Sequence, residues 1–450
     1  MPYDDTLDYL YQLQMHGIRP GLKRIKSLLS LLGHPEQQFQ SVHIAGTNGK
    51  GSTVAMVSSV LQEAGYRIGA YTSPHLIDFS ERITLSGASI SHQKIISLTA
   101  FIRNEITINA PHIQKEVTFF EFTTALAFLF FAEEGIDLAV VEVGLGGQFD
   151  ATNVLTPLVT AITQIDFDHE CYLGTTLLEI ASEKAGIIKE KIPVVTAVFL
   201  PEVAFLIKKV ADSKNAPLVR MGREINALSG LSNGDGSAKQ ATTFRFSGRK
   251  TYDIELSLPG HHQIDNATVA LGMIESLQNY AFSISENAIL DGMKSAFLPG
   301  RLEMIHRNPV TILDGAHNPA GAKTLGLFLR DLDPSGKGKH WLMFGVMRDK
   351  NVKEILSFLL PWTDELVLTS PKGKRALPPE EIAELIAPEL AEKNKTRTIE
   401  RTTRKNMTDA FSYIEAFIQP QDSLVITGSF YLVGEARDLL SRITPFVIRG

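Results

Sequence analysis

The stretch VHIAGTNGKGSTVAMVSSVLQEAG, residues 42–65, decides the fold. It begins with a short apolar run, passes through a glycine-rich turn, and ends in an amphipathic segment that Gly65 stops. This order predicts a strand, a loop and a helix. Glycines let a backbone approach a ligand closely, and the free N–H groups at a helix start attract anions. The stretch therefore predicts a phosphate-binding loop.

A cation completes this loop, because Lys50 lies between Gly49 and Gly51. We expect Lys50 to reach the outer phosphates of ATP and the Ser52 hydroxyl to ligate Mg²⁺. The spacing differs from the common G-x-x-x-x-G-K-[ST] pattern, since Gly51 separates Lys50 from Ser52. A glycine turn without a ligand is the alternative interpretation. The residues that we expect to hold ATP are Gly46, Thr47, Asn48, Gly49, Lys50, Gly51, Ser52 and Thr53.

Strands and helices alternate on the C-terminal side of the loop. Alternation of this kind is typical of a parallel sheet with helices on both faces. Two runs flank a segment rich in Gly, Ser, Asn and Lys at 229–250 and predict an antiparallel excursion. The expected strands are 67–71, 138–143, 158–165, 193–198, 242–246 and 251–258, and the expected helices are 53–64, 122–134, 177–188 and 266–277.

A second alternation follows the punctuating segment FLPGR at 297–301. A chain of 450 residues is long for one hydrophobic core, so we expect two domains, at 1–297 and 298–450. The predicted fold class is α/β, with a P-loop-type parallel-sheet domain covered by helices and a smaller Rossmann-like α/β domain. The expected strands of the second domain are 310–313, 341–344, 365–368 and 423–426, and its expected helices are 320–332 and 352–360.

Composition narrows the class of protein further. The chain has 44 basic and 50 acidic residues, a net charge of −6, which disfavours a broad nucleic-acid or anionic-membrane surface. Cys171 is the single cysteine, which excludes an intramolecular disulfide and fits a reducing compartment. The N-terminus lacks a signal-peptide pattern, and the longest apolar stretch, 123–132, is too short to span a bilayer. We expect a cytoplasmic protein that binds neither nucleic acid nor membrane.

Further motifs follow the loop along nearly the whole chain. Together with the loop, this series resembles the folylpolyglutamate synthase and dihydrofolate synthase family of the Mur ligase superfamily, with its motifs in family order. The motifs are HIAGTNGKGST (43–53), YTSPHL (71–76), ERI (81–83), FFEF (119–122), VEVGLGG (141–147), DATNV (150–154), DH (168–169), SEKAGIIK (182–189), GRLE (300–303), DGAHNP (314–319) and GSFYLVGE (428–435).

The resemblance implies an ATP-dependent, ADP-forming ligase that acts as a monomer. Its substrates would be L-glutamate and either dihydropteroate or the γ-carboxylate of a reduced folate, joined through an acyl phosphate. It implies two Mg²⁺ ions, held by positions that match Ser52, Ser73, Glu142 and His169. Without the resemblance, Glu142 could be a solvated strand-end carboxylate, His169 could serve a local hydrogen bond, and Ser73 could belong to a turn.

The resemblance also assigns catalytic and ATP-binding roles. Lys50, Lys184 and His317 would be catalytic, with Lys184 carboxylated so that it supports a second magnesium. Asn266, Arg301 and Asp314 would contact ATP. The alternatives are a solvated lysine at 184, a helix-start amide at 266, and an Arg301 that pairs with Glu303.

The folate site would lie in the first domain and the glutamate site in the second. Aromatic rings suit stacking on a flat pterin, although phenylalanine is also a common core residue. The stretches that match pteroate-contacting positions of the family consist of Thr118, Phe119, Phe120, Glu121, Phe149, Asp150 and Ala151.

Four functions remain open at this point. The motif DATN favours a bifunctional dihydrofolate synthase and folylpolyglutamate synthase, whereas Gln148-Phe149 departs from the usual Arg-Leu of the family. A folylpolyglutamate synthase alone and a ligase of peptidoglycan precursors are two further enzymatic readings. A P-loop regulatory protein that binds ATP without ligation is the non-enzymatic one.

Overall fold

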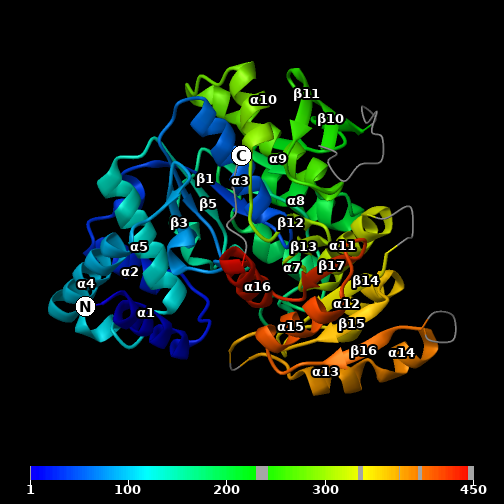
Figure 1. Ribbon diagram of the computed structural model, residues 1–450. Helices are drawn as coiled ribbons and strands as arrows, with labels where there is room; N and C mark the ends of the chain where they lie inside the picture. Colours follow the sequence, from blue (N-terminus) through cyan, green and yellow to red (C-terminus); the bar gives the residue numbers. More distant parts are fainter. Residues whose placement is uncertain (1, 230–241, 333–337, 374, 394–397, 444–450) are drawn as a thin grey trace. The chain divides into compact units, whose positions relative to one another are not determined.

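The computed structural model describes residues 2–229, 242–332, 338–373, 375–393 and 398–443 (Figure 1). They form two compact units. The first takes its residues from Met1–Asn233, Thr242–Ser257 and Gln263–Phe297, and the second from Leu258–His262 and Leu298–Gly450. Part of the predicted antiparallel excursion, 230–241, lies outside the described residues.

The first unit is built on a sheet in the order β4-β3-β2-β5-β1-β6-β7-β8. The strands from β2 to β8 in this order run parallel, and β3 and β4 extend the edge antiparallel. The strand that leads into the glycine loop, β1, is therefore central. The bounds are β1 (Gln40–Ala45), β2 (Ile68–Tyr71), β3 (Ile83–Leu85), β4 (Ala88–Ser89), β5 (Leu138–Glu142), β6 (Val159–Ile162), β7 (Val194–Thr196) and β8 (Leu218–Arg220).

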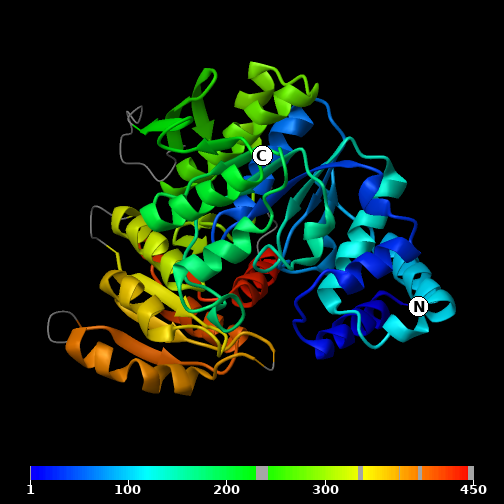
Figure 2. The same cartoon turned by 180° about the vertical axis from the view of Figure 1, so that it is seen from behind.

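Helices cover both faces of this sheet (Figures 1 and 2). One face packs against α5 beside β2 and β5, and against α7 and α8 beside β6 and β7. The other face carries α3, and Gly272 of α9 approaches Val195 of β7 there. The helices are α1 (Tyr3–Gln12), α2 (Lys23–Leu31), α3 (Lys50–Glu63), α4 (His92–Asn109), α5 (Phe119–Glu134), α6 (Glu170–Leu173), α7 (Leu177–Ala185), α8 (Pro201–Ser213), α9 (His262–Leu277) and α10 (Glu286–Ser295).

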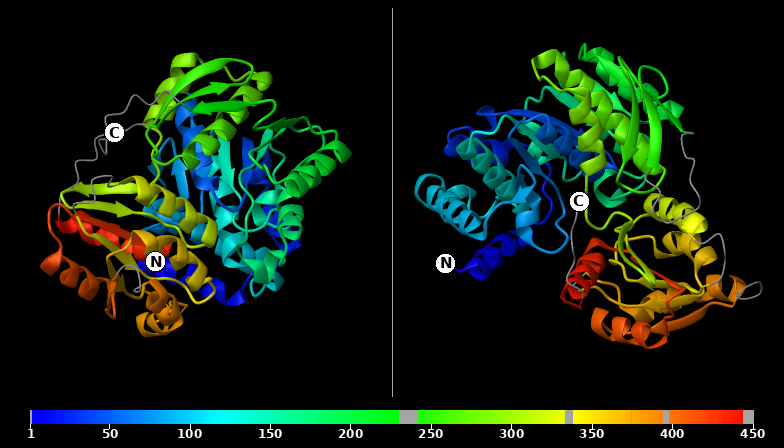
Figure 3. Two further views of the ribbon diagram at one scale, coloured as in Figure 1. Left: turned by 90° about the vertical axis from the view of Figure 1, so that its right-hand side faces the viewer. Right: turned by 45° about the horizontal axis from the view of Figure 1, so that its top comes forward.

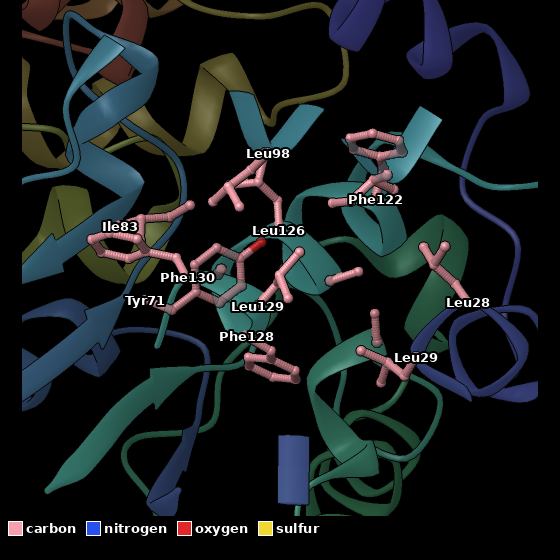
Figure 4. Packing of buried hydrophobic residues seen from close by; sticks show 14 of the residues in the cluster. Leu28, Leu29, Tyr71, Ile83, Leu98, Phe122, Leu126, Phe128, Leu129 and Phe130 are labelled. Carbon is pink, nitrogen blue, oxygen red and sulfur yellow. The ribbon is translucent and has the colours of Figure 1, made fainter. Parts of the chain in front are cut away.

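An aromatic-rich core anchors the N-terminal helices to the sheet. Figure 4 shows Phe122, Leu126 and Phe128 of α5 packed with Tyr71 of β2 and with leucines of α2. Helix α5 is apolar all round and almost wholly buried, as expected for a helix enclosed by other elements. This core fixes the position of the helix start at Thr118, where one predicted substrate stretch begins.

A small antiparallel sheet, β11-β10-β9, lies beside α10 (Figure 3). Its strands are β9 (Asn226–Ser229), β10 (Thr242–Ser247) and β11 (Thr251–Leu256). Phe244, Phe246, Tyr252 and Ile254 alternate with polar residues along β10 and β11 and are buried. The predicted antiparallel pairing of these two runs is confirmed.

The second unit contains a six-stranded sheet in the order β12-β13-β17-β14-β15-β16. Only β12 is antiparallel to its neighbour. The strands are β12 (Glu303–Arg307), β13 (Val310–Leu313), β14 (His340–Phe344), β15 (Glu365–Leu368), β16 (Glu400–Thr403) and β17 (Ser423–Thr427), and the helices are α11 (Pro319–Leu332), α12 (Val352–Leu359), α13 (Pro379–Leu385), α14 (Ala387–Lys393), α15 (Met407–Phe417) and α16 (Phe430–Ile443).

The predicted α/β fold class is confirmed, whereas three helices begin three or more residues earlier than expected. Helix α3 begins at Lys50, inside the loop. Helix α5 begins at Phe119, because Thr118 and Glu121 form a capping box. Helix α9 begins at His262, so Asn266 lies in the second turn and the interpretation of it as a helix-start amide was wrong.

Candidate active site

The glycine loop turns tightly between β1 and α3 and needs glycine at two of its positions. Gly46 has φ +153° and Gly49 has φ +89°. A Cβ atom at Gly46 would lie 1.8 Å from the Thr163 hydroxyl, and one at Gly49 would lie 2.1 Å from the Asn266 side-chain oxygen. The loop is therefore packed against the end of β6 and against α9, where Asn266 borders it.

Residues just after β6 hold the loop in shape. The Thr47 amide donates to the Gln164 carbonyl (2.7 Å), and the Thr163 hydroxyl donates to the Asn48 carbonyl (2.7 Å). The Thr47 hydroxyl donates to the Asp166 carbonyl at 2.9 Å. These partners were not predicted, because they lie more than a hundred residues away in the sequence and carry no motif.

Lys50 lies at the centre of the loop. Its Nζ donates to the carbonyl oxygens of Gly46 and Thr47, both at 3.1 Å, and lies 3.9 Å from Oε1 of Glu142. The other oxygen of Glu142 accepts a hydrogen bond from the Ser73 amide at 3.1 Å. The structure thus brings together three predicted residues from separate motifs: Lys50, Ser73 and Glu142.

The other two predicted metal positions differ in exposure. Ser52 is buried in the first turn of α3, whereas the His169 ring is 40% exposed and lies 3.9 Å from the Asp168 carboxylate. Within the described ranges, no three His, Cys, Asp or Glu side chains form a metal-binding group. Magnesium often takes only one or two protein oxygens and keeps several water molecules. Ser52 and the carboxylate of Glu142 supply donors of the right chemistry.

Lys184 is only 4% exposed, so the solvated-lysine interpretation was wrong. Its Nζ donates to the Gly46 carbonyl at 2.9 Å, the same oxygen that accepts from Lys50. The pKa of Lys184 is lowered from 10.5 to about 7, mainly by burial and in part by the positive charge of Lys50. A substantial share of the Lys184 amine is therefore uncharged near neutral pH.

The glycine-rich segment after β5 lies between α5 and α7. A Cβ atom at Gly147 would meet the backbone of Glu183 and Lys184 at 2.6 and 2.9 Å, and one at Gly144 would meet the Phe120 ring at 2.3 Å. Phe120 in turn stacks on Tyr71, with ring centroids 5.9 Å apart. The half-buried Phe120 therefore borders the strand end that carries Glu142.

Three of the predicted substrate residues make internal polar contacts. Glu121 accepts hydrogen bonds from the Thr118 amide (2.9 Å) and from the Arg24 guanidinium (3.0 Å). The carboxylate of Asp150 accepts from the amides of Leu145 (2.9 Å) and Thr152 (3.0 Å). The T-x-x-E pattern of a capping box is a signal from which the Thr118 to Glu121 contact could have been predicted. Arg24 carried no such signal.

The predicted aromatic residues of the substrate stretches are all partly accessible. Phe149 is 45% exposed, while Ala151 beside it is buried. Phe119 is half-buried and packs edge-on against Phe79, with the Arg82 guanidinium 5.3 Å from its ring centre. None of the three predicted rings is fully enclosed in the core.

The second unit gathers Arg301, Asp314 and His317 around Phe430. The Arg301 guanidinium lies 4.5 Å from the Phe430 ring centre, and the His317 ring centre lies 5.4 Å from it. Asp314 accepts hydrogen bonds from the Leu302 and Ala316 amides, both at 2.9 Å. Burial raises the pKa of Asp314, and the positive charge of Arg301 opposes this shift.

Glu303, the other partner considered for Arg301, is hydrogen-bonded to both backbone and side-chain groups. It accepts hydrogen bonds from the Gly300 amide (2.8 Å) and from Arg437 (3.0 Å).

Asn318 caps α11 by accepting from the Gly321 amide at 2.8 Å. Phe430 was missed as a member of this cluster, although it lies in the quoted motif GSFYLVGE.

Comparison with known families matches both units. The model of the Mur ligase middle domain matches residues 44–274, and that of the Mur ligase, glutamate ligase domain matches residues 300–430. One unit contains the strand, glycine loop and helix, and the other contains a mostly parallel sheet. Together with the two family matches, these features define the protein as a Mur ligase.

Individual relatives give a finer assignment. The dihydrofolate synthase/folylpolyglutamate synthase of Bacillus subtilis is 36% identical over 97% of this chain and 99% of its own length, and that of Escherichia coli is 30% identical over 98% and 96%. The chain belongs to this family of dihydrofolate and folylpolyglutamate synthases, which confirms the predicted family and its ligase class.

Solved structures of the same family also match nearly the whole chain. The folylpolyglutamate synthase of Mycobacterium tuberculosis complexed with ADP and AMPPCP has a TM-score of 0.86 at 32% identity and covers 98% of this chain and 99% of its own. E. coli FolC in complex with DHPP and ADP has a TM-score of 0.85 at 29% identity, with 99% of each chain covered. A Yersinia pestis enzyme of the family was solved with AMPPNP and a Mn ion, at a TM-score of 0.83 and 27% identity, covering 98% of both chains.

None of the described helices is both long and apolar enough to cross a bilayer.

Proposed function

We propose that this chain uses ATP and a divalent metal to add L-glutamate to dihydropteroate and to the γ-carboxylate of reduced folates. The observation that carries the proposal is the convergence of the Lys50 and Lys184 amines on the Gly46 carbonyl, beside Glu142. The names of the relatives, which combine both activities, and the complexes with ADP, AMPPNP, Mn and DHPP support it.

The reaction needs a carboxylate to attack the γ-phosphorus of ATP, although both groups are anionic. Lys50 and the backbone N–H groups at the start of α3 offset this repulsion, because they direct positive charge toward the phosphates. Ser52 and Glu142 would hold a divalent metal, which would supply further positive charge toward the phosphates. Ser73, whose amide orients Glu142, and His169 complete the proposed metal set.

A carboxylate oxygen of the folate forms a bond to the γ-phosphorus, and ADP leaves with the electron pair of the broken P–O bond. The amine of glutamate then attacks the carbonyl carbon of the acyl phosphate, loses a proton, and expels phosphate. Orientation of the reactants can supply roughly 7 to 11 kcal/mol of the barrier reduction in such reactions.

The folate is proposed to bind beside Phe120. That ring borders Gly144 at the end of β5, so a pterin stacked on it would leave its carboxylate side toward Glu142 and Lys50. Phe119 and the 45% exposed Phe149 would contribute further aromatic surface. Thr118, Glu121, Asp150 and Ala151 would shape this site mainly through the internal contacts described above.

The first domain, 1–297, is proposed to carry the ATP and folate sites, and the second, 298–450, to bind glutamate. Arg301 and Asp314 would contact ATP, and His317 would act near the reacting groups. Asn266 supports an ATP role through its contact with the loop at Gly49. We further propose that the enzyme acts as a cytoplasmic monomer.

A panel of acceptors separates the proposed function from its rivals. The protein is incubated with ATP, Mg²⁺, glutamate and either dihydropteroate, tetrahydrofolate or a muramyl peptidoglycan precursor, and product masses are read. We expect products one glutamate heavier from the first two acceptors. Product from tetrahydrofolate alone would favour the monofunctional alternative. Product from the muramyl precursor alone, or ATP binding without any product, would contradict the proposal.

Lys184 is proposed to form a carbamate with CO₂. The uncharged amine is the reactive form, and its pKa of about 7 makes it far more abundant near neutrality than for an ordinary lysine. At constant CO₂ pressure we expect an isotopically labelled carbamate signal that grows as pH rises from about 6 to about 8, through the lowered pKa. Carbon NMR of protein equilibrated with labelled CO₂ measures it.

The control for this prediction is Lys184→Met, which keeps the length of the side chain without the amine. This variant should lack the signal and lose most of its activity. A signal that persists in Lys184→Met, or a wild-type enzyme that is fully active in CO₂-free buffer without the signal, would contradict the assignment.

A further inference from the structure

A buried hydrogen-bonded chain links β1 to the predicted substrate stretch in the first unit. His43 and Thr152 are completely buried, and Nε2 of His43 lies 2.7 Å from the Thr152 hydroxyl. The same hydroxyl donates to Oδ1 of Asp150. Asp150 is buried as well, and its other oxygen accepts from the Leu145 amide at 2.9 Å.

The groups that donate and accept in this chain can be assigned from the number of protons that each group has. Burial raises the pKa of Asp150, and the backbone N–H groups that its two oxygens accept, from Thr152 and Leu145, oppose this shift and stabilise the carboxylate. The single proton of the Thr152 hydroxyl goes to Asp150, so this hydroxyl must accept from His43. His43 is therefore the neutral tautomer with its proton on Nε2. Its strongly lowered pKa of about 3, caused mainly by burial, agrees with a neutral ring.

The stability of the fold alone does not explain a histidine at position 43. The residues on either side of it in β1, Val42 and Ile44, are fully buried and apolar, and Nδ1 of His43 is buried with no hydrogen-bond partner among the described residues. A buried polar atom without a partner costs free energy that an apolar side chain would avoid. The contact to Thr152 is thus the feature that distinguishes His43 from its neighbours.

The chain joins two parts of the active site. His43 lies three residues before Gly46 in the strand that leads into the phosphate loop. Asp150 links the start of the 3-10 helix Ala151–Val154 to the glycine segment at Leu145. That segment packs on the Phe120 ring through Gly144. A shift of Thr152 and Asp150 would therefore move the proposed folate-binding surface.

We propose that His43 is a positioning residue that sets folate affinity, because its Nε2–H holds the Thr152 hydroxyl and, through it, the Asp150 carboxylate in place. His43 acts through Thr152 and does not itself touch folate or ATP. The proposal rests on the proposed function, and it assigns to this strand a role in acceptor binding in addition to its role in shaping the phosphate loop.

Thr152→Val tests the proposal directly, because it removes the hydroxyl with little change of shape. We expect the KM for tetrahydrofolate to rise about tenfold, the size expected when a buried contact to a charged group is lost. The KM for ATP should change less than twofold. Thr152→Ser, which keeps the hydroxyl, should restore a KM within about threefold of that of the wild type.

Substitutions at His43 test the same hydrogen bond from its other side. His43→Gln can place an amide donor near the position of Nε2 and should keep a low KM for folate, whereas His43→Leu should raise it as Thr152→Val does. Thr152→Val added to His43→Leu should have little further effect, because both remove one contact. Thr99→Val is the matched control: the Thr99 hydroxyl is equally buried and has no partner among the described residues.

The outcomes separate this proposal from the proposed function. A folded Thr152→Val variant that ligates glutamate with unchanged KM for folate would overturn the role of His43 and leave the ligase assignment intact. Equal changes in the KM values for ATP and folate in Thr152→Val would also overturn the role of His43. The same holds if Thr99→Val raises the folate KM as much as Thr152→Val does. A wild-type protein that forms no folate product under any condition would instead contradict the proposed function itself.

Discussion

Replacement of Lys50 with alanine is expected to lower kcat about 1,000-fold, the size of effect seen when a main electrostatic group at a reacting centre is removed. The reason is its location. Nζ of Lys50 lies in the phosphate loop, on the carbonyls of Gly46 and Thr47, and 3.9 Å from Glu142. Without this cation, negative charge on the transferring phosphoryl group would lose a protein counter-charge within the loop itself. Steady-state rates of ADP formation at saturating ATP measure the effect.

Lys191→Ala is the control for Lys50→Ala. Its side chain is 76% exposed and forms an ion pair with the adjacent, exposed Glu190, so kcat should stay within about twofold. Circular dichroism should show both variants folded. Near-normal turnover of Lys50→Ala at saturating ATP would show that Lys50 is not the catalytic cation.

Gly46→Ala is expected to remove nucleotide binding and to lower the free energy of unfolding by roughly 2 to 5 kcal/mol. Two costs combine in this range: strain of a backbone region that L side chains rarely adopt, and overpacking of a buried contact. The added Cβ would lie 1.8 Å from the Thr163 hydroxyl and 3.3 Å from the Gln164 carbonyl. Any shift of Gly46 would also displace the carbonyl that holds Lys50 and Lys184.

Gly65→Ala separates strain from packing. Gly65 follows α3, the helix that begins in the loop, and has φ +88°, but a Cβ atom there would meet nothing within 4 Å. We expect this variant to lose only about 1–2 kcal/mol and to keep its affinity for ATP. Urea unfolding and calorimetric titration with ATP measure both variants. Equal losses of stability and of ATP affinity in the two would contradict the packing argument.

Local patterns predicted much of this molecule. The strand, loop and helix around Lys50 and the alternating elements after it follow from the period of apolar residues and from glycine stops, which act over a few residues. The position of Glu142 at a strand end follows from the same pattern, because ligands gather at the carboxyl ends of parallel strands. The motif series added the family, which the comparisons confirm.

Contacts over long sequence separations could not be predicted in this way. Lys184 and Gly46 are 138 residues apart, and only the packing of α7 beside the loop shows that the lysine is buried and touches it. Thr163 and His43 likewise look like ordinary strand residues until the fold places them against Gly46 and Thr152. The earlier start of α9 was missed because no strong cap precedes His262 in the sequence.

The central claim is that ATP transfers its γ-phosphoryl group to the folate carboxylate before glutamate attacks. The most direct test follows oxygen atoms. Dihydropteroate labelled with a heavy oxygen isotope in its carboxylate is incubated with the enzyme, ATP, Mg²⁺ and glutamate, and the released phosphate is examined by mass spectrometry. We predict that the phosphate carries one labelled oxygen from the carboxylate. Product formed with unlabelled phosphate would contradict the acyl-phosphate mechanism.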